Sequence, residues 1–401
     1  MAGAVFVVAG SATPEQGPVA ALLSTAGWTA AAERVVGRSW VVTPHGVLTA
    51  AEARQRGSSP ALCSRRRSGF RRRLPAVAKT AAKDVLQWQT SRRFTIDPDG
   101  PWSGSDIAFV WQRHDLFHTA GLDLAKRLGA PSVLFVPAAK VWEAEQWGTR
   151  RPGWGRVLER RAERPALRGA DVVACGSEAV VEQVLRIGVA EARVLLTPTG
   201  VDLDLFAEPR DPAPLRSRLG LQDRFVVGWV GSFRRFHALD QAVRAAATVP
   251  SAVLLLVGDG PERARIERLA DDLAVPARFT GTVPRHELPA YLAAMDAAVI
   301  LAPRDQPFHY SPLKLGEYLA AGLPVVAPAV GQLAERLTDG VDATLVPPRN
   351  VDALGAALRG LRDDPEERIR LGKAARAAAE AEWSWDGQVR RVIDALAHAW
   401  P

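Results

Sequence analysis

Short apolar runs alternate with helix-length segments throughout the second half of this 401-residue chain, and this alternation limits the possible folds more than any other feature. The runs have four to six residues, which is the length of buried strands. Strands that alternate with helices form βαβ units, which build a parallel, doubly wound sheet. The predicted strands are Phe225–Val230, Ala252–Val257, Ala297–Leu301, Pro324–Ala327 and Ala343–Val346, and the predicted helices are Leu239–Ala247, Pro261–Leu273, Glu287–Ala294, Pro312–Ala321 and Val351–Leu361.

The first half repeats this scheme less regularly, and a turn-rich segment, Thr197–Phe206, separates the two halves. In a parallel sheet the loops that follow the strands meet at one edge, where ligands bind. We therefore predict two α/β domains that face each other across a cleft for a bulky polar ligand. The predicted strands of the first domain are Ala4–Ala9, Trp40–Thr43, Ile107–Val110, Val133–Val136 and Asp171–Ala174.

Composition argues for a globular protein in a reducing compartment. Hydrophobic residues make up 47% of the chain and charged residues 24%. Cys63 and Cys175 lie far apart and form no metal-ligand spacing, so we expect neither a disulfide framework nor a zinc site. The N-terminal residues lack the basic region of a signal peptide, and no 18 apolar residues run together. We therefore expect a cytoplasmic protein.

The net charge of +7 is concentrated in one part of the chain. Residues 51–93 contain twelve Lys and Arg but only two acidic residues, Glu52 and Asp84. Such a segment is either a solvated helix face or a contact for an anionic partner. Arg65–Arg73 lacks the interleaved aromatic series of a single-strand binding platform, so we expect no nucleic acid partner. Peripheral membrane contact through residues 54–93 stays an open alternative.

The most informative segment is Phe308–Ala327. Ser311 is a favourable N-cap, Pro312 suits the first helical position, and Gly322 is expected to end the helix. Backbone N–H groups at a helix N-terminus attract anions such as a diphosphate. The segment therefore predicts a helix whose first turn binds phosphate.

Two charged residues on this helix extend the prediction. Lys314 falls in the first turn, where a cation is unfavourable unless an anion binds nearby. Glu317 lies one turn further on and can accept hydrogen bonds from a ribose diol. The alternative is an ordinary surface helix on which Lys314 and Glu317 form an ion pair.

The motif Ser311–Val326 resembles the donor-site signature of retaining glycosyltransferases of family 4, which have the GT-B fold. The resemblance implies two Rossmann-like doubly wound domains that face a central cleft. It assigns residues 1–198 to acceptor binding and 199–384 to donor binding, and we expect a C-terminal helix in 385–401 to cross back to the first domain. Four further segments are similar to family motifs in the same order: Gly200–Phe206 (linker), Gly231–Asp240 (glycine loop), Leu254–Pro261 (Gly-Asp-Gly turn) and Phe279–Val283 (base-binding strand end).

The resemblance also implies roles for individual residues. Val283 would face the base, Glu317 the ribose, and the start of the helix the diphosphate. The family usually has Glu where His309 stands, and often has Arg and Lys where Ser232 and His237 stand. The implied nucleotide-sugar site consists of Gly17, Gly231, Ser232, Arg234, Arg235, Val283, Ser311, Pro312, Leu313, Lys314 and Glu317, where Arg234 and Arg235 could restore the missing positive charge.

The acceptor side rests on a weaker resemblance, at the ends of strands in the first domain. It places Arg113, His114, Glu143 and Glu145 at the cleft, with a structural role as the alternative for His114. The catalytic candidates are therefore His309, His237, Lys314 and His114.

These expectations define a metal-independent hexosyltransferase without a cofactor. Lys314, His237 and helix N–H groups would stabilise the departing diphosphate. Asp97–Asp99 is read as a turn, not as a metal-binding triplet. The expected donor is a UDP-sugar, with a GDP-sugar as the next candidate. The expected acceptor is a small polar metabolite of specialised metabolism. The alternatives are a lipid-linked saccharide at the membrane surface, or a non-transferase GT-B enzyme such as a nucleotide-sugar epimerase.

Overall fold

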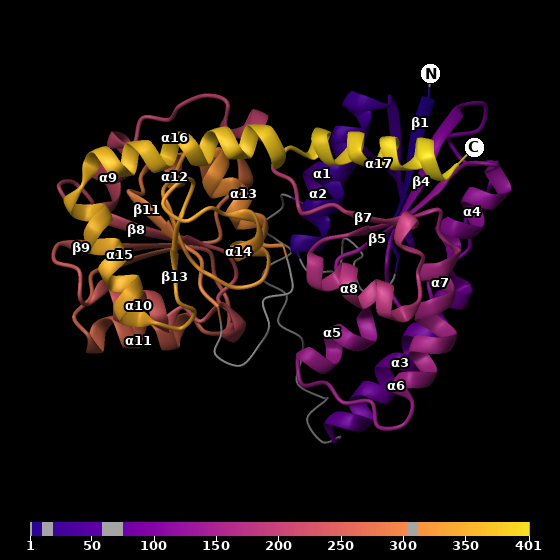
Figure 1. Ribbon diagram of the computed structural model, residues 1–401, viewed down its shortest axis with the longest axis horizontal. Coiled ribbons are helices and arrows are strands. Elements are labelled where there is room, and N and C mark those ends of the chain that lie inside the picture. The colour runs from indigo at the N-terminus through magenta and orange to yellow at the C-terminus, as the bar shows by residue number, and fades with distance from the viewer. Residues whose placement is uncertain (1, 10–18, 58–74, 303–310, 401) are drawn as a thin grey trace. The chain divides into compact units, whose positions relative to one another are not determined.

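Two separate β-sheets organise the protein, and each belongs to a different unit of the chain (Figure 1). The computed structural model describes residues 2–9, 19–57, 75–302 and 311–400. The first unit comprises Met1–Gly200, His309–Ser311 and Trp385–Pro401, and the second comprises Val201–Phe308 and Pro312–Ser384.

The sheet of the first unit has seven strands among the described residues, in the order β3-β2-β1-β4-β5-β6-β7. All neighbouring strands are parallel except β2 and β3, which form an antiparallel hairpin. The five predicted strands are confirmed; β3 and β7 were missed because they are short and largely unburied. The strands are β1 (Ala2–Val7), β2 (Arg38–Thr43), β3 (Gly46–Thr49), β4 (Asp106–Arg113), β5 (Ser132–Val136), β6 (Val172–Cys175) and β7 (Val194–Leu196).

The helices of the first unit are α1 (Val19–Val35), α2 (Ala50–Gly57), α3 (Ala76–Arg93), α4 (Ala120–Leu128), α5 (Lys140–Gln146), α6 (Gly155–Leu158), the π-helix η3 (Glu159–Glu163), α7 (Arg164–Gly169), α8 (Glu178–Ile187), the 3-10 helix η4 (Glu191–Arg193) and α17 (Trp385–Ala399). Of these, α1, α2, α4, α8 and α17 pack most closely against the sheet, whose central strands are buried as in doubly wound folds.

The last helix, α17, packs on α1 within the first unit. The Trp385 ring lies 5.7 Å from that of Trp28, which is itself fully buried. A side chain at Gly27 would overlap the Trp385 indole, so only glycine permits this approach. Asp386 accepts hydrogen bonds from Arg34 on α1, one of them 2.5 Å long. Aromatic packing and one ion pair therefore hold the end of the chain on this unit.

The sheet of the second unit is entirely parallel in the described residues, with the order β10-β9-β8-β11-β12-β13. Its predicted strands and helices are confirmed to within about two residues at most boundaries. The strands are β8 (Phe225–Val230), β9 (Ala252–Val257), β10 (Ala277–Gly281), β11 (Ala297–Val299), β12 (Val325–Pro328) and β13 (Thr344–Val346).

The helices of the second unit complete the α/β alternation. They are η5 (Leu203–Phe206), α9 (Ala213–Leu219), η6 (Arg235–His237), α10 (Asp240–Ala246), α11 (Arg263–Asp272), η7 (Arg285–Glu287), α12 (Leu288–Ala293), α13 (Leu313–Ala320), α14 (Gln332–Arg336), α15 (Val351–Asp363) and α16 (Pro365–Glu382), of which η5, η6 and η7 are 3-10 helices.

Each sheet has a point where the strand order reverses, between β1 and β4 in the first unit and between β8 and β11 in the second. Doubly wound sheets bind ligands beyond the carboxyl ends of the strands at this point. The loops that follow β4 and β8 are therefore the expected positions of a ligand site.

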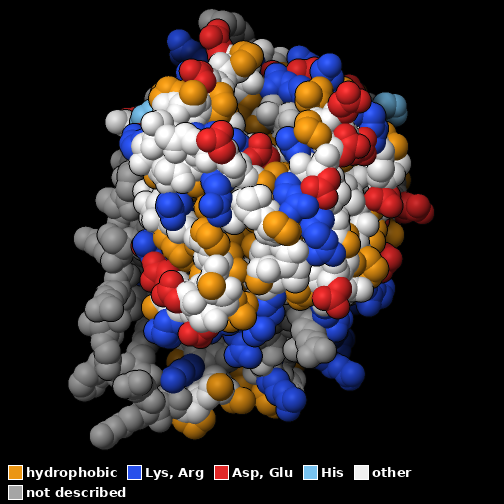
Figure 2. Space-filling view, turned by 90° about the vertical axis from the view of Figure 1, so that its left-hand side faces the viewer, with side chains coloured by type: hydrophobic (Ala, Val, Ile, Leu, Met, Phe, Trp, Pro, Cys, Tyr) orange, Lys and Arg blue, Asp and Glu red, His pale blue; other side chains and the backbone are white. Residues whose placement is uncertain are grey.

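The surface seen in Figure 2 carries acidic and basic side chains interspersed with one another. None of the described helices has the length and apolar composition of a bilayer-crossing segment.

Candidate functional site

The loop after β8 and the turn after β9 interlock through their backbones. Gly231 donates its N–H to the Val257 carbonyl at 2.9 Å, and Phe233 donates to the Asp259 carbonyl at 3.0 Å. A side chain at Gly258 would collide with the carbonyl oxygen of Gly231, and Gly258 has φ 128°. Only glycine fits there. The predicted glycine loop and Gly-Asp-Gly turn therefore form one rigid edge at the strand reversal.

Lys314 lies against this edge from the first turn of α13. Its Nζ is 3.8 Å from the centre of the Trp229 ring, within the range of a cation–π contact. A Cβ on Gly231 would lie 3.0 Å from the same Nζ, so the absence of a side chain at Gly231 lets the amine reach the loop. Burial lowers the pKa of Lys314 to about 7, although the negative charge of Glu317 opposes this effect.

His237 packs among aromatic rings beside Lys314. Its ring centre lies 5.3 Å from that of Trp229 and 4.3 Å from that of Phe236. Burial lowers the pKa of His237 to about 2, and the positive charges of Lys314 and Arg234 add to this effect. The imidazole is therefore neutral at physiological pH. It can donate or accept a hydrogen bond, but it cannot supply the charge of the Lys that the resemblance places there.

The two arginines of the glycine loop, Arg234 and Arg235, are exposed to solvent at the start of η6. Ser232, in the same loop, is also exposed. Among the described residues neither arginine has an ion pair with an acidic side chain. The positive charge at this edge therefore comes from Lys314 and these two arginines.

Glu317 lies one turn beyond Lys314 and is 6% exposed. Its Oε1 accepts a hydrogen bond of 2.6 Å from Nη1 of Arg285. Arg285 begins η7, directly after Val283 and Pro284, the turn expected to face a nucleotide base. Arg285 was not predicted as a site residue from the sequence. Its position two residues after Val283 was the sequence feature that could have identified it as a site residue.

The predicted N-cap of α13 is wrong. The helix begins at Leu313, and Pro312 occupies the N-cap position with an extended backbone (ψ 119°). The Ser311 hydroxyl accepts a hydrogen bond from the Thr199 N–H at 3.0 Å, so this side chain is engaged elsewhere. No side chain of the described residues caps α13, which leaves its first N–H groups available for an anion. Gly322 does end the helix, with φ 65°.

Three groups of predicted residues lie outside the described part of the chain. They are His309, Gly17 and the basic run Arg65–Arg73.

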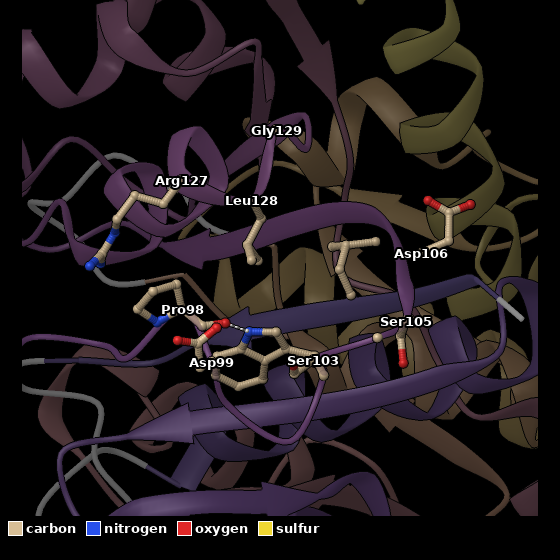
Figure 3. A pocket seen from close by; sticks show the side chains of 11 residues that line it. Pro98, Asp99, Ser103, Ser105, Asp106, Arg127, Leu128 and Gly129 are labelled. Atoms are coloured by element: carbon tan, nitrogen blue, oxygen red, sulfur yellow. Dashed lines mark hydrogen bonds between the residues drawn. The ribbon is translucent and has the colours of Figure 1, made fainter.

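A cavity of about 520 Å³ lies in the first unit, at the amino end of β4 (Figure 3). Trp102 lines it and donates its indole N–H to the Pro98 carbonyl at 2.9 Å. Asp99 donates its N–H to Oδ1 of Asp97 at 3.0 Å, which confirms the predicted turn. This cavity is at the sheet edge opposite to the one where ligands bind in doubly wound folds. No described group of three or more His, Cys, Asp or Glu residues could hold a metal ion.

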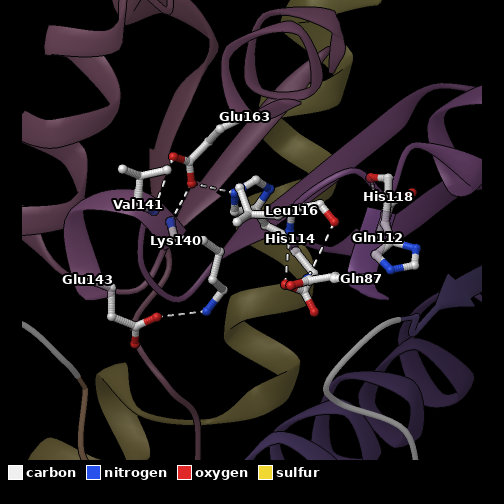
Figure 4. Close-up of polar contacts among 10 residues, drawn as sticks. Gln87, Gln112, His114, Leu116, His118, Lys140, Val141, Glu143 and Glu163 are labelled. Atoms are coloured by element: carbon white, nitrogen blue, oxygen red, sulfur yellow. Dashed lines mark hydrogen bonds and ion pairs between the residues drawn. The ribbon is translucent and has the colours of Figure 1, made fainter. Parts of the chain in front are cut away.

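His114 follows β4 at the carboxyl edge of the same sheet and is 1% exposed (Figure 4). Its Nε2 lies 2.9 Å from Oε1 of Glu163, which is fully buried in the π-helix η3. Glu163 also accepts hydrogen bonds from the backbone N–H groups of Lys140 and Val141, the first residues of α5. One carboxylate therefore holds both the loop after β4 and the start of α5. Glu163 could not be predicted from the sequence, because no motif or spacing relates it to His114.

The loop from His114 to His118 has a constrained backbone. Phe117 has φ 69°, a region that bulky side chains rarely adopt. Asp115 accepts hydrogen bonds from the Leu116 N–H at 2.9 Å and from Gln87 at 2.5 Å. His118 is 3% exposed, and neither of its ring nitrogens has a hydrogen-bond partner among the described residues. Such strain commonly marks functional loops.

The other three acceptor-side candidates differ in exposure. Arg113 lies 5.7 Å from the Phe135 ring centre, and burial lowers its pKa to about 10 against the opposing charges of Glu143 and Asp115. Glu143 is half-buried and pairs with Lys140 at 2.9 Å. Glu145, two residues further along α5, is exposed. The structure thus places Arg113 near Glu143.

Family models match both halves of the chain. Residues 224–364 match a family described as "Glycosyl transferases group 1", and residues 38–205 match "Glycosyltransferase Family 4".

Two curated relatives illustrate the sequence similarity. The GDP-mannose-dependent alpha-(1-6)-phosphatidylinositol monomannoside mannosyltransferase of Mycolicibacterium smegmatis is 32% identical over 61% of this chain and 67% of its own. The D-inositol 3-phosphate glycosyltransferase of Mycolicibacterium paratuberculosis is 34% identical over 56% of this chain and 52% of its own. The chain thus spans about half to two thirds of the length of these relatives.

Solved structures share the fold over nearly the whole chain. HepE from Anabaena, in complex with UDP, matches with a TM-score of 0.69 and 19% identity, covering 99% of this chain and 100% of its own. Sucrose-phosphate synthase from Thermosynechococcus elongatus matches with a TM-score of 0.67 and 22% identity, covering 99% of each chain. The predicted GT-B fold, with its two doubly wound domains, is confirmed.

The lowered pKa of Lys314 predicts that nucleotide binding depends on pH. A bound diphosphate favours the charged ammonium, so binding above pH 7 takes up a proton. We expect the affinity for UDP or GDP to fall about tenfold between pH 7 and pH 9. His237 stays neutral over this range and does not contribute. Calorimetry in buffers of different ionisation enthalpy measures the proton uptake, which Lys314→Met should abolish. Equal wild-type affinity at both pH values would contradict the assignment.

Removal of Glu163 should loosen α5. Glu163→Ala leaves the His114 ring nitrogen and two backbone N–H groups without their acceptor. We expect the opening free energy of α5 to fall by about 2 kcal/mol, which makes its amide hydrogens exchange about 30-fold faster. Glu159→Ala, in the same π-helix, is the control and should change exchange little. The role of Glu163 is refuted if both variants exchange alike by mass spectrometry.

Proposed function

Because the chain belongs to the group 1 and family 4 glycosyltransferases, we propose that it transfers a hexosyl group from a nucleotide-diphosphate sugar to an acceptor hydroxyl, without a metal ion and with retention of configuration. The observation that carries this proposal is the meeting of Lys314 and the glycine loop at the strand reversal of the second unit. This is the position of ligand sites in doubly wound sheets.

The donor site acts on the departing diphosphate. As the bond between the anomeric carbon and the diphosphate oxygen breaks, negative charge develops on the leaving group. The ammonium of Lys314 and the uncapped N–H groups of α13 stabilise that charge. Glu317 accepts hydrogen bonds from the ribose, and the Val283 backbone faces the base. His237 donates a neutral hydrogen bond.

The acceptor oxygen then bonds to the anomeric carbon on the face that the diphosphate leaves. A donor phosphate oxygen takes the acceptor proton, which balances the step and retains the configuration. Retention of the anomeric configuration is inferred from the sequence resemblance to retaining glycosyltransferases. For the acceptor we propose a polyhydroxylated compound of the inositol type, because two relatives are named for inositol-containing acceptors. The comparisons give no support to an acceptor from specialised metabolism. UDP and GDP sugars are both candidate donors.

The purified protein should release UDP or GDP from a sugar nucleotide in the presence of EDTA, because its own cations and N–H groups stabilise the leaving group. Nucleotide release from a panel of UDP- and GDP-sugars, with inositol as acceptor, identifies the donor. NMR of the product reports the anomeric configuration. Activity that disappears in EDTA and returns with Mn²⁺ would rule out the metal-independent proposal, and an inverted product would rule out retention.

A second candidate acceptor is a lipid-linked saccharide, and helix α3 favours it. Its acidic residue, Asp84, is buried and paired with Arg151 at 2.8 Å. The rest of the helix therefore presents basic charge together with apolar side chains, a combination that binds anionic lipid surfaces. The exposed apolar residues of α3 are Val77, Val85, Leu86 and Trp88, and its exposed basic residues are Lys79, Lys83, Arg92 and Arg93.

Binding to vesicles tests this candidate. The protein should sediment with vesicles of phosphatidylglycerol and phosphatidylcholine, and a Leu86→Ser, Trp88→Ser double variant should bind about tenfold more weakly. Ile369→Ser, on α16, removes an apolar side chain of similar exposure (58% against 52% for Leu86) and should leave binding unchanged. Equal binding by wild type and the double variant would remove α3 as a lipid contact.

A further inference from the structure

The Glu317 carboxylate is deeply buried beside two different cations. Its side chain is 8% exposed, and a carboxylate so far from water needs a partner of opposite charge. Lys314 lies one turn before it, and Arg285 approaches from η7. The question is which of the two compensates Glu317 before any ligand binds.

Arg285 is the permanent partner. The pKa of Lys314 is lowered to about 7, so this amine is uncharged in about half of the molecules at neutral pH. Its Nζ also lies over the Trp229 ring, whereas Nη1 of Arg285 donates directly to Oε1 of Glu317 at 2.6 Å. A guanidinium stays charged at every physiological pH. Lys314 is thus left for a second anion, while Arg285 provides the opposite charge beside the Glu317 carboxylate.

The ion pair leaves half of the carboxylate available. The bond from Arg285 uses Oε1, and no hydrogen bond to Oε2 occurs within the described residues. An ionised oxygen accepts strong hydrogen bonds from hydroxyl groups. Arg285 is also joined through Pro284 to Val283, so a single ion pair fastens the turn proposed to face the base to the helix proposed to hold the ribose.

We infer that Arg285 is a positioning residue that makes donor binding depend on the ribose hydroxyls: by holding Oε1 of Glu317, it fixes the carboxylate so that Oε2 accepts from the diol. The inference rests on the proposed role of Glu317 in nucleotide-sugar binding. It assigns to Arg285 the discrimination between ribonucleotides and 2′-deoxyribonucleotides. A pair that only stabilised the fold would not affect this discrimination.

The experiment compares the binding of ribo- and 2′-deoxyribonucleotides by calorimetry. The ligands are UDP, GDP and their 2′-deoxy forms, and the proteins are wild type, Arg285→Met and Arg285→Lys. We expect wild type to prefer the ribonucleotide by about tenfold or more, because the deoxy form leaves a buried acceptor unpaired. In Arg285→Met the ribonucleotide should bind about tenfold more weakly and the deoxy form nearly as before, so that the preference is lost. Arg285→Lys keeps the positive charge and should restore part of the preference for the ribonucleotide.

A matched control comes from the other end of the same sheet. Arg216 is 20% exposed, as Arg285 is, and pairs with Asp296 at 2.7 Å just before β11. Arg216→Met therefore removes a comparable ion pair at the amino edge of the sheet, opposite to the edge that carries the candidate site, and it should leave the preference unchanged whatever it does to thermal stability.

Three outcomes overturn the inference. If Arg285→Met keeps the ribonucleotide preference, or lowers both affinities equally, Arg285 does not position Glu317 for the ribose. If wild type binds both nucleotide forms equally well, the donor proposal stands but the ribose role of Glu317 and Arg285 fails. If wild type binds neither UDP nor GDP, the proposed donor and the role of Arg285 fail together.

Discussion

The candidate donor site depends on a backbone contact between two loops that have no side chains where they meet. The carbonyl of Gly231 occupies the space that a side chain at Gly258 would fill. This contact joins the ends of β8 and β9 and leaves the space above Trp229 open to Lys314. A larger residue at either glycine would separate the loops or displace the amine. Lys314 thus reaches the Trp229 ring because Gly231 has no side chain in its path.

The charges at this edge suit the anion that is proposed to bind there. Lys314 has lost most of the hydration that keeps an amine charged, which is why its pKa falls to about 7. His237 has lost its charge entirely, since burial and two neighbouring cations act in the same direction. A diphosphate would restore the charge of Lys314, and α13 adds first-turn N–H groups that no described side chain caps. The proposed binding of a diphosphate is therefore coupled to the protonation of Lys314.

Buried carboxylates organise both candidate sites. Glu317 ties α13 to η7 through Arg285, and Glu163 ties the loop after β4 to the start of α5. Each is almost fully removed from water and engages groups from a different element. Buried charges are costly unless they are paired and hydrogen-bonded, so each fixes the geometry of the groups around it. The π-helix that carries Glu163 is a form often found at functional sites.

Most of the fold, and the outline of the candidate donor site, could be predicted from the amino-acid sequence. Apolar runs and helical spacing are local properties, so the end of α13 at Gly322 and every strand of the second unit except β10 could be predicted. The strand β10 is only partly buried and carries no continuous apolar run. Which side chains pair with each other depends on the three-dimensional packing of the chain. Arg285 lies 32 residues from Glu317, His114 lies 49 from Glu163, and Thr199 lies 112 from Ser311, whose hydroxyl it engages. No local pattern relates such distant residues, because their contact arises only when the strands and loops that carry them are packed together.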